Sequence, residues 1–195
     1  MTYKLLSRMA LAIMIALVFT FTAATNNMMV TMQDELVEGR LGAVRFSTIS
    51  LLIATIQSAT AKDTILLVMH SPGGNVYAGF QIIDKLIATD AKTVGFIPQA
   101  CYSMCAMITL HMDKIRLAPD AKIMFHMYHY QGYKALPGTW LSKIDPSMND
   151  YFISSFKLMK EKGLLTDLEY RGILKGYDIY ISGSDYNKRL ERIGR

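Results

Sequence analysis

The stretch Ile65-Leu66-Leu67-Val68-Met69-His70-Ser71-Pro72-Gly73-Gly74 decides the fold class, because an unbroken apolar run ends there in a Pro-Gly-Gly turn. An apolar run without polar alternation predicts a strand that is buried on both faces of a parallel sheet. The two glycines leave backbone N–H groups without a shielding Cβ at the C-terminal end of this strand. A developing oxyanion needs such donors, so the turn is a candidate part of an acyl-transfer site.

Two further segments complete the candidate site. Ser103 follows a second apolar run, residues 93–97, and opens a predicted helix over residues 104–111. A serine at a helix N-terminus holds its oxygen near the positive end of the helix dipole. His126 closes the apolar run 122–125 and is the predicted base that takes the proton from a serine nucleophile. Each segment alone is common, whereas the ordered set predicts one site.

The rest of the chain predicts an α/β fold, because strands and helices alternate as they do in right-handed βαβ units. Short apolar runs predict strands, and apolar side chains at three- and four-residue spacing predict helices. The predicted strands are residues 28–32, 64–69, 93–97, 114–117, 122–125 and 177–181, and the helices between them are residues 46–60, 76–89 and 104–111.

Capping signals predict two helices near the C-terminus. Residues 128–139, which precede them, are rich in glycine, tyrosine and proline and are predicted to form a loop. Asp145-Pro146 supplies an N-cap and a proline at the first helical position. Thr166 and Glu169 have the spacing of a capping box, and Gly176 suits the end of the helix that they begin.

Four segments resemble motifs of the proteolytic subunit of the Clp protease family. They are His70-Ser71-Pro72-Gly73-Gly74, Gln99-Ala100-Cys101-Tyr102-Ser103-Met104-Cys105-Ala106, Pro119-Asp120-Ala121-Lys122-Ile123-Met124-Phe125-His126 and the shorter Asp178-Ile179-Tyr180-Ile181-Ser182. The resemblance covers roughly residues 35–185. It implies a Clp protease/crotonase-like α/β fold, a βαβ superhelix with a parallel-sheet core and a projecting handle helix.

The resemblance also implies a serine endopeptidase that works through an acyl-enzyme. Ser103 would be the nucleophile, His126 the base, and Asp178 the carboxylate that orients the imidazole and stabilises its charged form. The backbone N–H groups of Gly74 and Met104 would form the oxyanion hole. Neither a cofactor nor a metal is expected, and the chain has no zinc-ligand spacing.

In this family the subunits assemble into stacked rings that enclose the active sites and degrade peptides or unfolded proteins. The resemblance therefore implies a homo-oligomeric ring with a peptide or an unfolded protein as substrate. The apolar helix around Phe152 and Phe156 has the length and place of the handle that pairs two rings. From the residues alone, that helix can equally pack on its own sheet.

Other candidates compete for the catalytic roles. His129 is the rival base and Asp185 the reserve carboxylate, whereas His70 and His111 are expected to serve in packing or at the surface.

Two other functions also stay open. A signal-peptide-peptidase-like relative on a similar fold would use a Ser-Lys dyad, with Lys114 or Lys122 as its base. A catalytically inactive scaffold subunit is the third hypothesis, because Cys105 stands where the family has a glycine after Ser-Met.

The two cysteines, Cys101 and Cys105, flank Ser103. They are either small buried packing residues or a disulfide pair. Within one helix, residues at this spacing are too far apart for comfortable bridge geometry, so a disulfide requires that Cys101 precede the helix.

The N-terminus has the pattern of an export signal. Lys4 and Arg8 precede an uncharged stretch, residues 9–25, as in a secretory signal peptide or a retained membrane anchor. We therefore expect residues 1–25 to be a signal or anchor, and residues 26–195 to form one peptidase domain. The expected location is exported, periplasmic or membrane-anchored, with the cytoplasm as the alternative. Export would separate the protein from a cytosolic ATPase, so an ATPase partner stays open.

The net charge of +5 does not predict nucleic-acid binding. The basic residues are scattered, and no long basic run has interleaved aromatic residues. A mild excess of this kind is typical of a solvated surface.

Overall fold

The computed structural model describes residues 27–32 and 43–195. The predicted signal or anchor, residues 1–25, lies outside these ranges. Within them, no helix has both the length and the apolar character that crossing a bilayer requires.

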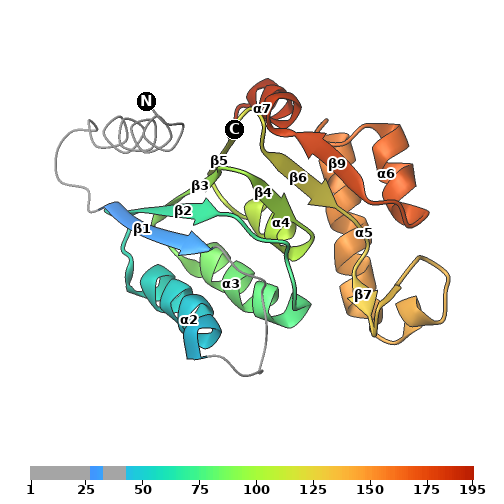
Figure 1. The fold of residues 1–195 in the computed structure, drawn as a ribbon, viewed down its shortest axis with the longest axis horizontal. Helices are drawn as coiled ribbons and strands as arrows, with labels where there is room; N and C mark the ends of the chain where they lie inside the picture. Colours follow the sequence, from blue (N-terminus) through green and yellow to red (C-terminus); the bar gives the residue numbers. More distant parts are fainter. Residues whose placement is uncertain (1–26, 33–42) are drawn as a thin grey trace, which may run out of the picture.

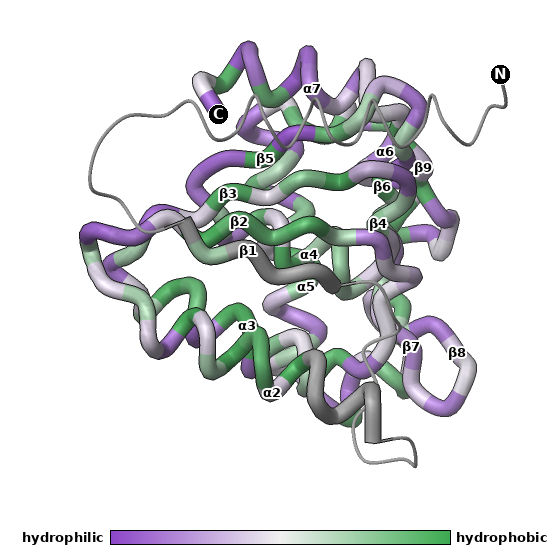
Figure 2. The backbone as a smooth tube through the Cα atoms, turned by 60° about the vertical axis from the view of Figure 1, so that its left-hand side comes forward, coloured by the Kyte–Doolittle hydropathy of each residue, from purple (hydrophilic) through white to green (hydrophobic). Residues whose placement is uncertain are grey.

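A four-stranded parallel sheet forms one half of the domain (Figure 1). Its order is β1 (Asn27–Met32), β2 (Thr64–Met69), β3 (Lys92–Ile97) and β5 (Lys114–Leu117). Helices α2 (Ala43–Ser58) and α3 (Val76–Ala88) lie along one face of this sheet (Figure 2). The predicted α/β fold with a parallel-sheet core is confirmed.

Strand β2 is less evenly buried than its apolar sequence predicts. Ile65, Leu67 and Met69 are fully buried, while the residues that alternate with them are only partly buried. Alternate side chains point to opposite faces of a sheet, so the two faces of β2 differ in how completely they are covered.

A second, smaller sheet follows the C-terminal ends of the first. Its order is β4 (Ala100–Tyr102), β6 (Lys122–Phe125) and β9 (Ile179–Ser182), with β4 parallel and β9 antiparallel to β6. An isolated parallel bridge between Ser71 and Cys101 joins the Pro-Gly-Gly turn to this sheet. The sequence patterns did not predict β4, since a strand so short has no measurable periodicity.

Helix α5 (Pro146–Glu161) packs its apolar side on its own domain. Phe152, Phe156 and Met159 are all buried, and the ring of Phe156 meets that of Phe125 edge-on, with centroids 6.4 Å apart. Leu158, on another side of the helix, is 49% exposed. The predicted helix is thus present, and its apolar face packs on its own domain, on the core around β6; its role as a handle that pairs two rings stays a prediction.

The helix boundaries follow the predicted caps. The Asp145 side chain accepts a hydrogen bond from the N–H of Met148 at 3.0 Å, and the capping box of Thr166 and Glu169 is present at the start of α6 (Asp167–Leu174).

A polar helix that the sequence patterns missed, α7 (Gly183–Arg192), follows β9. The guanidinium of Arg189 is buried and donates hydrogen bonds to both Glu169 and Asp185, which ties α7 to α6.

The predicted loop over residues 128–139 contains a small hairpin, β7 (His129–Tyr130) and β8 (Tyr133–Lys134), and the short helix η1 (Leu141–Lys143) follows it. The two residues between the strands, Gln131 and Gly132, both have positive φ, 49° and 84°. This is the backbone that a tight two-residue hairpin turn requires. The aromatic residues on either side of the turn therefore pair as strands instead of forming an irregular loop.

We predict that Phe156→Ala lowers the free energy of unfolding by about 3–5 kcal/mol, the usual cost of truncating a buried phenylalanine. The matched control on the same helix, Leu158→Ala, should change it by only about 0.5 kcal/mol because that side chain is half exposed. Urea unfolding of both variants measures the difference. Equal losses would show that the apolar side of α5 does not pack on the core.

Candidate active site

The three predicted catalytic residues come from the ends of three adjacent strands. Ser103 follows β4, His126 follows β6, and Asp178 precedes β9. In the strand register Tyr102 lies opposite Met124, and Phe125 lies opposite Ile179. The sheet order β4-β6-β9 therefore places the candidate nucleophile, base and carboxylate side by side in that sequence.

Ser103 occupies a sharp turn from β4 into α4 (Met104–Thr109), with φ 56° and ψ −123°. Its N–H donates to the carbonyl of Met124 at 2.9 Å, which fixes it next to β6. A non-glycine residue with positive φ is strained, and such strain clusters at functional sites. The serine side chain makes no capping hydrogen bond to α4, so its hydroxyl is not used to terminate the helix.

The Pro-Gly-Gly turn lies directly against this serine. Gly73 has φ +97°, and a Cβ on it would lie 2.6 Å from the carbonyl oxygen of Tyr102 and 2.8 Å from the Cβ of Ser103. Only glycine fits there without moving the turn. The N–H of Gly73 donates to the Ser71 hydroxyl at 3.1 Å.

The N–H of Met104 stands at the first position of α4, where no acceptor exists within the helix. The same hypothetical Cβ of Gly73 would lie 3.0 Å from this nitrogen, so the glycine turn and the N–H are close neighbours. Gly74 and Met104 remain the predicted oxyanion donors.

His126 is buried, and its Nδ1 lies 2.6 Å from the carbonyl oxygen of Met127. A carbonyl only accepts, so Nδ1 carries the hydrogen and Nε2 keeps the lone pair of a neutral imidazole. Burial lowers the pKa of His126, and the positive charges of His129 and Lys134 lower it further, against the raising effects of the Met127 hydrogen bond and of Asp178. The lowered pKa favours the neutral form of the imidazole, which is the form that a general base needs.

Asp178 pairs with a residue that the sequence patterns did not single out. The ammonium of Lys134 donates to Asp178 Oδ1 at 2.7 Å and to the carbonyl of Gly176 at 2.6 Å. Burial acts to raise the pKa of Asp178, but the hydrogen bond and charge of Lys134 outweigh it and lower this pKa. No local pattern marks a single lysine in a tyrosine-rich loop, so this pairing could be found only in three dimensions.

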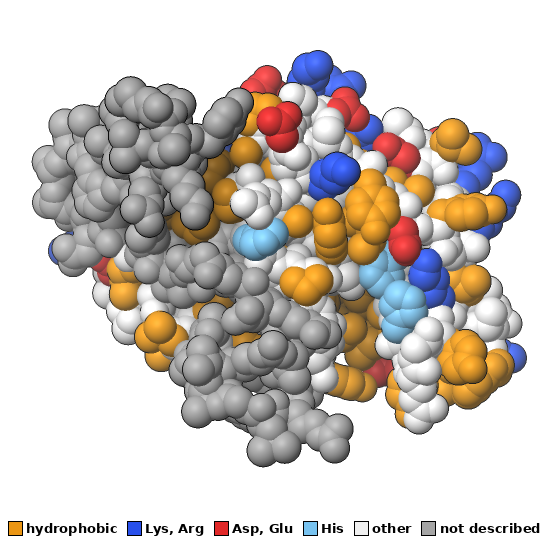
Figure 3. Space-filling model, in the orientation of Figure 1, with side chains coloured by type: hydrophobic (Ala, Val, Ile, Leu, Met, Phe, Trp, Pro, Cys, Tyr) orange, Lys and Arg blue, Asp and Glu red, His pale blue; other side chains and the backbone are white. Residues whose placement is uncertain are grey.

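The strand ends bring the three residues into one region, but their side chains are not hydrogen-bonded to one another in the described part of the chain. Among the described residues, His126 is bonded to Met127 and Asp178 to Lys134, and no hydrogen bond joins His126 to Ser103 or Asp178. Asp178 is still close enough for its charge to act on His126. In Figure 3 a pair of adjacent histidines, next to one acidic and one basic side chain, reaches the surface on this side of the domain.

The rival histidine and the reserve carboxylate have different surroundings. The ring of His129 is 4.7 Å from that of His126 but is exposed. Asp185 accepts from Arg189 at 2.7 Å in α7 and serves the fold there. His111 bonds the hydroxyl of Tyr151 at 2.8 Å, as expected for a packing residue.

The two lysines proposed for a dyad are exposed at the first positions of their strands. Lys122 begins β6, at the end opposite to His126, and Lys114 begins β5 in the other sheet. The strand ends next to Ser103 therefore carry His126, not a lysine from this pair.

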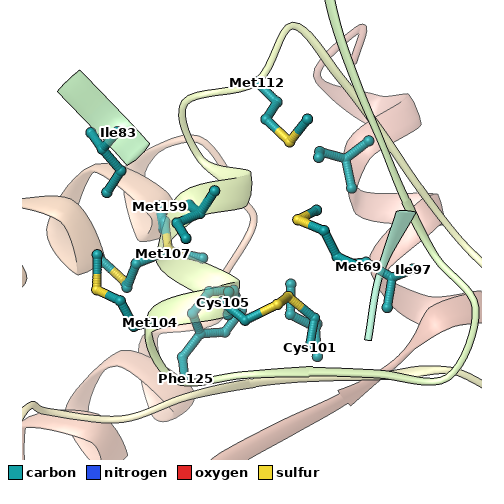
Figure 4. Close-up of a cluster of buried hydrophobic side chains, with 14 of the residues drawn as sticks. Met69, Ile83, Ile97, Cys101, Met104, Cys105, Met107, Met112, Phe125 and Met159 are labelled. Carbon is teal, nitrogen blue, oxygen red and sulfur yellow. A yellow bond between two sulfur atoms is a disulfide. The ribbon is translucent and has the colours of Figure 1, made fainter. Parts of the chain in front are cut away.

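Cys101 and Cys105 form a disulfide, with their Cα atoms 5.3 Å apart (Figure 4). Cys101 lies in β4 and Cys105 in α4, so the bridge spans the turn at Ser103 and meets the requirement that one cysteine precede the helix. In the described part of the chain, no cluster of histidine, cysteine and acidic residues could hold a metal ion.

A family model for Clp protease matches residues 27–134, more than half of the 195-residue chain. The chain therefore belongs to the Clp protease family. This membership supports its general assignment as a peptidase of the Clp type. The match includes the glycine turn, Ser103 and His126, while Asp178 lies beyond it. No curated protein matches this chain.

We predict that NMR titration of His126 will give a pKa below the ordinary 6.5, because burial and neighbouring cations disfavour the imidazolium. Lys134→Met should raise this pKa, since it removes a cation and leaves the Asp178 carboxylate without its ion pair. Lys157→Met, on the exposed side of α5, is the matched control and should not change it. A fall in the His126 pKa on Lys134→Met would contradict this account of the charges.

Proposed function

We propose that the protein is a serine endopeptidase that cleaves peptide bonds through Ser103, His126 and Asp178. The observation that carries the proposal is the strand order β4-β6-β9, in which the ends of adjacent strands supply the three residues in catalytic sequence. The strained turn at Ser103 supports it, as does Nε2 of His126, which has no hydrogen-bond partner among the described residues.

The reaction follows from these positions. Ser103 Oγ attacks the scissile carbonyl carbon while its proton passes to Nε2 of His126. The N–H groups of Gly74 and Met104 hold the oxyanion that forms. When the tetrahedral intermediate collapses, the C–N bond breaks and His126 gives its proton to the leaving amine. Water then attacks the acyl-enzyme by the same steps and releases the acid and the free serine.

Asp178 stabilises the imidazolium that forms in each step. For Asp178 to accept from Nδ1–H, this hydrogen must leave the carbonyl of Met127, and Asp178 must loosen its bond to Lys134. The Lys134–Asp178 pair is partly exposed, and exposed ion pairs are weak. We therefore expect Asp178 to exchange its bond to Lys134 for one to Nδ1–H of His126 when substrate is bound.

Reaction with a fluorophosphonate probe tests the proposal. The wild type should be labelled at Ser103, and Ser103→Ala should lose both the label and a factor on the order of a million in kcat. Ser154→Ala, an exposed serine on α5, is the matched control and should behave as the wild type. A folded Ser103→Ala protein that still cleaves peptides at the wild-type rate refutes the nucleophile.

Variants of the base distinguish the alternatives in the same assay. His126→Ala should be nearly as damaging as Ser103→Ala, and the two losses should not add, because the residues act as a unit. His129→Ala should be mild. If Lys122→Ala abolished activity and His126→Ala did not, the Ser-Lys dyad would replace the triad. A wild type that is neither labelled nor active would favour the inactive scaffold.

We also propose that the protein works outside the cytoplasm, as a homo-oligomeric ring. The disulfide supports export, because disulfides persist in oxidising compartments, and Lys4 and Arg8 ahead of residues 9–25 form the signal. N-terminal sequencing of the protein from fractionated cells decides between a cleaved signal and an anchor. An intact Met1 in the soluble cytosolic fraction would refute export and restore a cytosolic ATPase as partner.

Light scattering of the purified protein would measure the number of subunits in the assembly.

A further inference from the structure

The Cys101–Cys105 disulfide encloses the candidate nucleophile. Both cysteines are fully buried, and the residues between them are Tyr102, Ser103 and Met104. Figure 4 shows the bond among the buried side chains of Met69, Met107 and Phe125. The bridge closes a short loop with Ser103 at its centre, so it limits the backbone conformations that Ser103 can adopt.

Other helices of this protein show what a capping residue does without such a link. Asn75, Thr166 and Ser182 all have negative φ, between −60° and −73°, and each side chain accepts a hydrogen bond from the first turn of its helix. Ser103 stands at the same position of α4, yet it has φ 56° and makes no such bond.

Serine is among the strongest N-cap residues, so the ordinary capping conformation is a competing state for Ser103. In that state its hydroxyl would bond to the first turn of α4. Its oxygen lone pair would then be engaged by a backbone N–H, and a change of φ from 56° would move the side chain from the position that it holds in this structure. Non-covalent contacts also oppose this change, since Ser103 N–H donates to Met124 and Tyr102 N–H donates to Ser71, and the disulfide adds a covalent constraint to them.

We infer that the Cys101–Cys105 disulfide is a positioning element that keeps Ser103 out of the capping conformation and so keeps its hydroxyl available for nucleophilic attack. The inference rests on the proposed function of Ser103. It assigns to Cys105, which departs from the family pattern, a role in the site that it adjoins.

A dithiol such as dithiothreitol can reduce the disulfide. One thiolate of the dithiol attacks a cysteine sulfur and the S–S bond breaks. The second thiolate then resolves the mixed disulfide. The two cysteines gain two electrons and two protons in total, and the dithiol becomes a cyclic disulfide.

The test compares the oxidised wild type with Cys101→Ala/Cys105→Ala. Without the disulfide, Ser103 should spend most of its time in the capping conformation. In the double variant, kcat and the rate of fluorophosphonate labelling should therefore fall on the order of tenfold to a hundredfold. KM should change little, because the peptide-binding surface is intact. The wild type, reduced in mild denaturant and refolded under dithiothreitol, should show the same loss and recover on reoxidation. Dithiothreitol should leave the double variant unchanged, which controls for effects elsewhere.

A double variant that folds and is labelled at the wild-type rate overturns the inference while leaving the proposed function intact. An oxidised wild type that is not labelled refutes the proposed function instead. In that case, a crystal structure of the double variant decides the inference without activity. Ser103 with negative φ and its hydroxyl bonded to α4 supports the inference, and an unchanged φ near 56° overturns it.

Discussion

The backbone of residues 100–103 is hydrogen-bonded on both sides, and the candidate site depends on this double pairing. On one side, the N–H of Ser71 donates to the carbonyl of Ala100 and the N–H of Tyr102 donates to the carbonyl of Ser71, each at 3.0 Å. On the other side, the N–H of Ser103 donates to Met124 at 2.9 Å. The first pairing brings the glycine turn to the serine, and the second brings the strand that ends at His126.

The core supports this arrangement from the side of β6. Phe125, the residue before His126, is buried against Phe156 of α5 and Tyr186 of α7. The other edge of β6 pairs with β9, which carries Asp178 from near the end of the chain. The late helices therefore do more than cover the sheet, because they hold the strands that place the candidate base and the candidate carboxylate. This explains why Asp178, although outside the matched part of the family model, belongs to the same structural unit as Ser103.

The sequence predicted those parts of the fold that rest on local pattern. The boundaries of β2, β5 and β6 agree residue for residue with the predicted strands, and the capping signals before α5 and α6 are confirmed. Strand β4, which it missed, depends on distant contacts, because Ser71 and β6 pair with it. Helix α7 was missed although it has a local signal: Ser182 caps its start, and Tyr186 and Leu190, four residues apart, are buried. Its mostly polar sequence hides this short pattern, and the ion pairs of Arg189 add a tertiary contact that the sequence does not show.

The candidate site shows the same division. Motifs predicted which residues come together, since the ends of neighbouring strands meet at one edge, but not how these residues are bonded. Whether the cysteines pair depends on β4 ending before Ser103, and the partner of Asp178 depends on a hairpin that folds Lys134 back onto it. Under the proposed mechanism, Asp178 would pair with Lys134 in the resting protein and with the imidazolium of His126 during the reaction. Because an imidazolium attracts Asp178 and repels Lys134, protonation of His126 itself favours the exchange that would complete the relay.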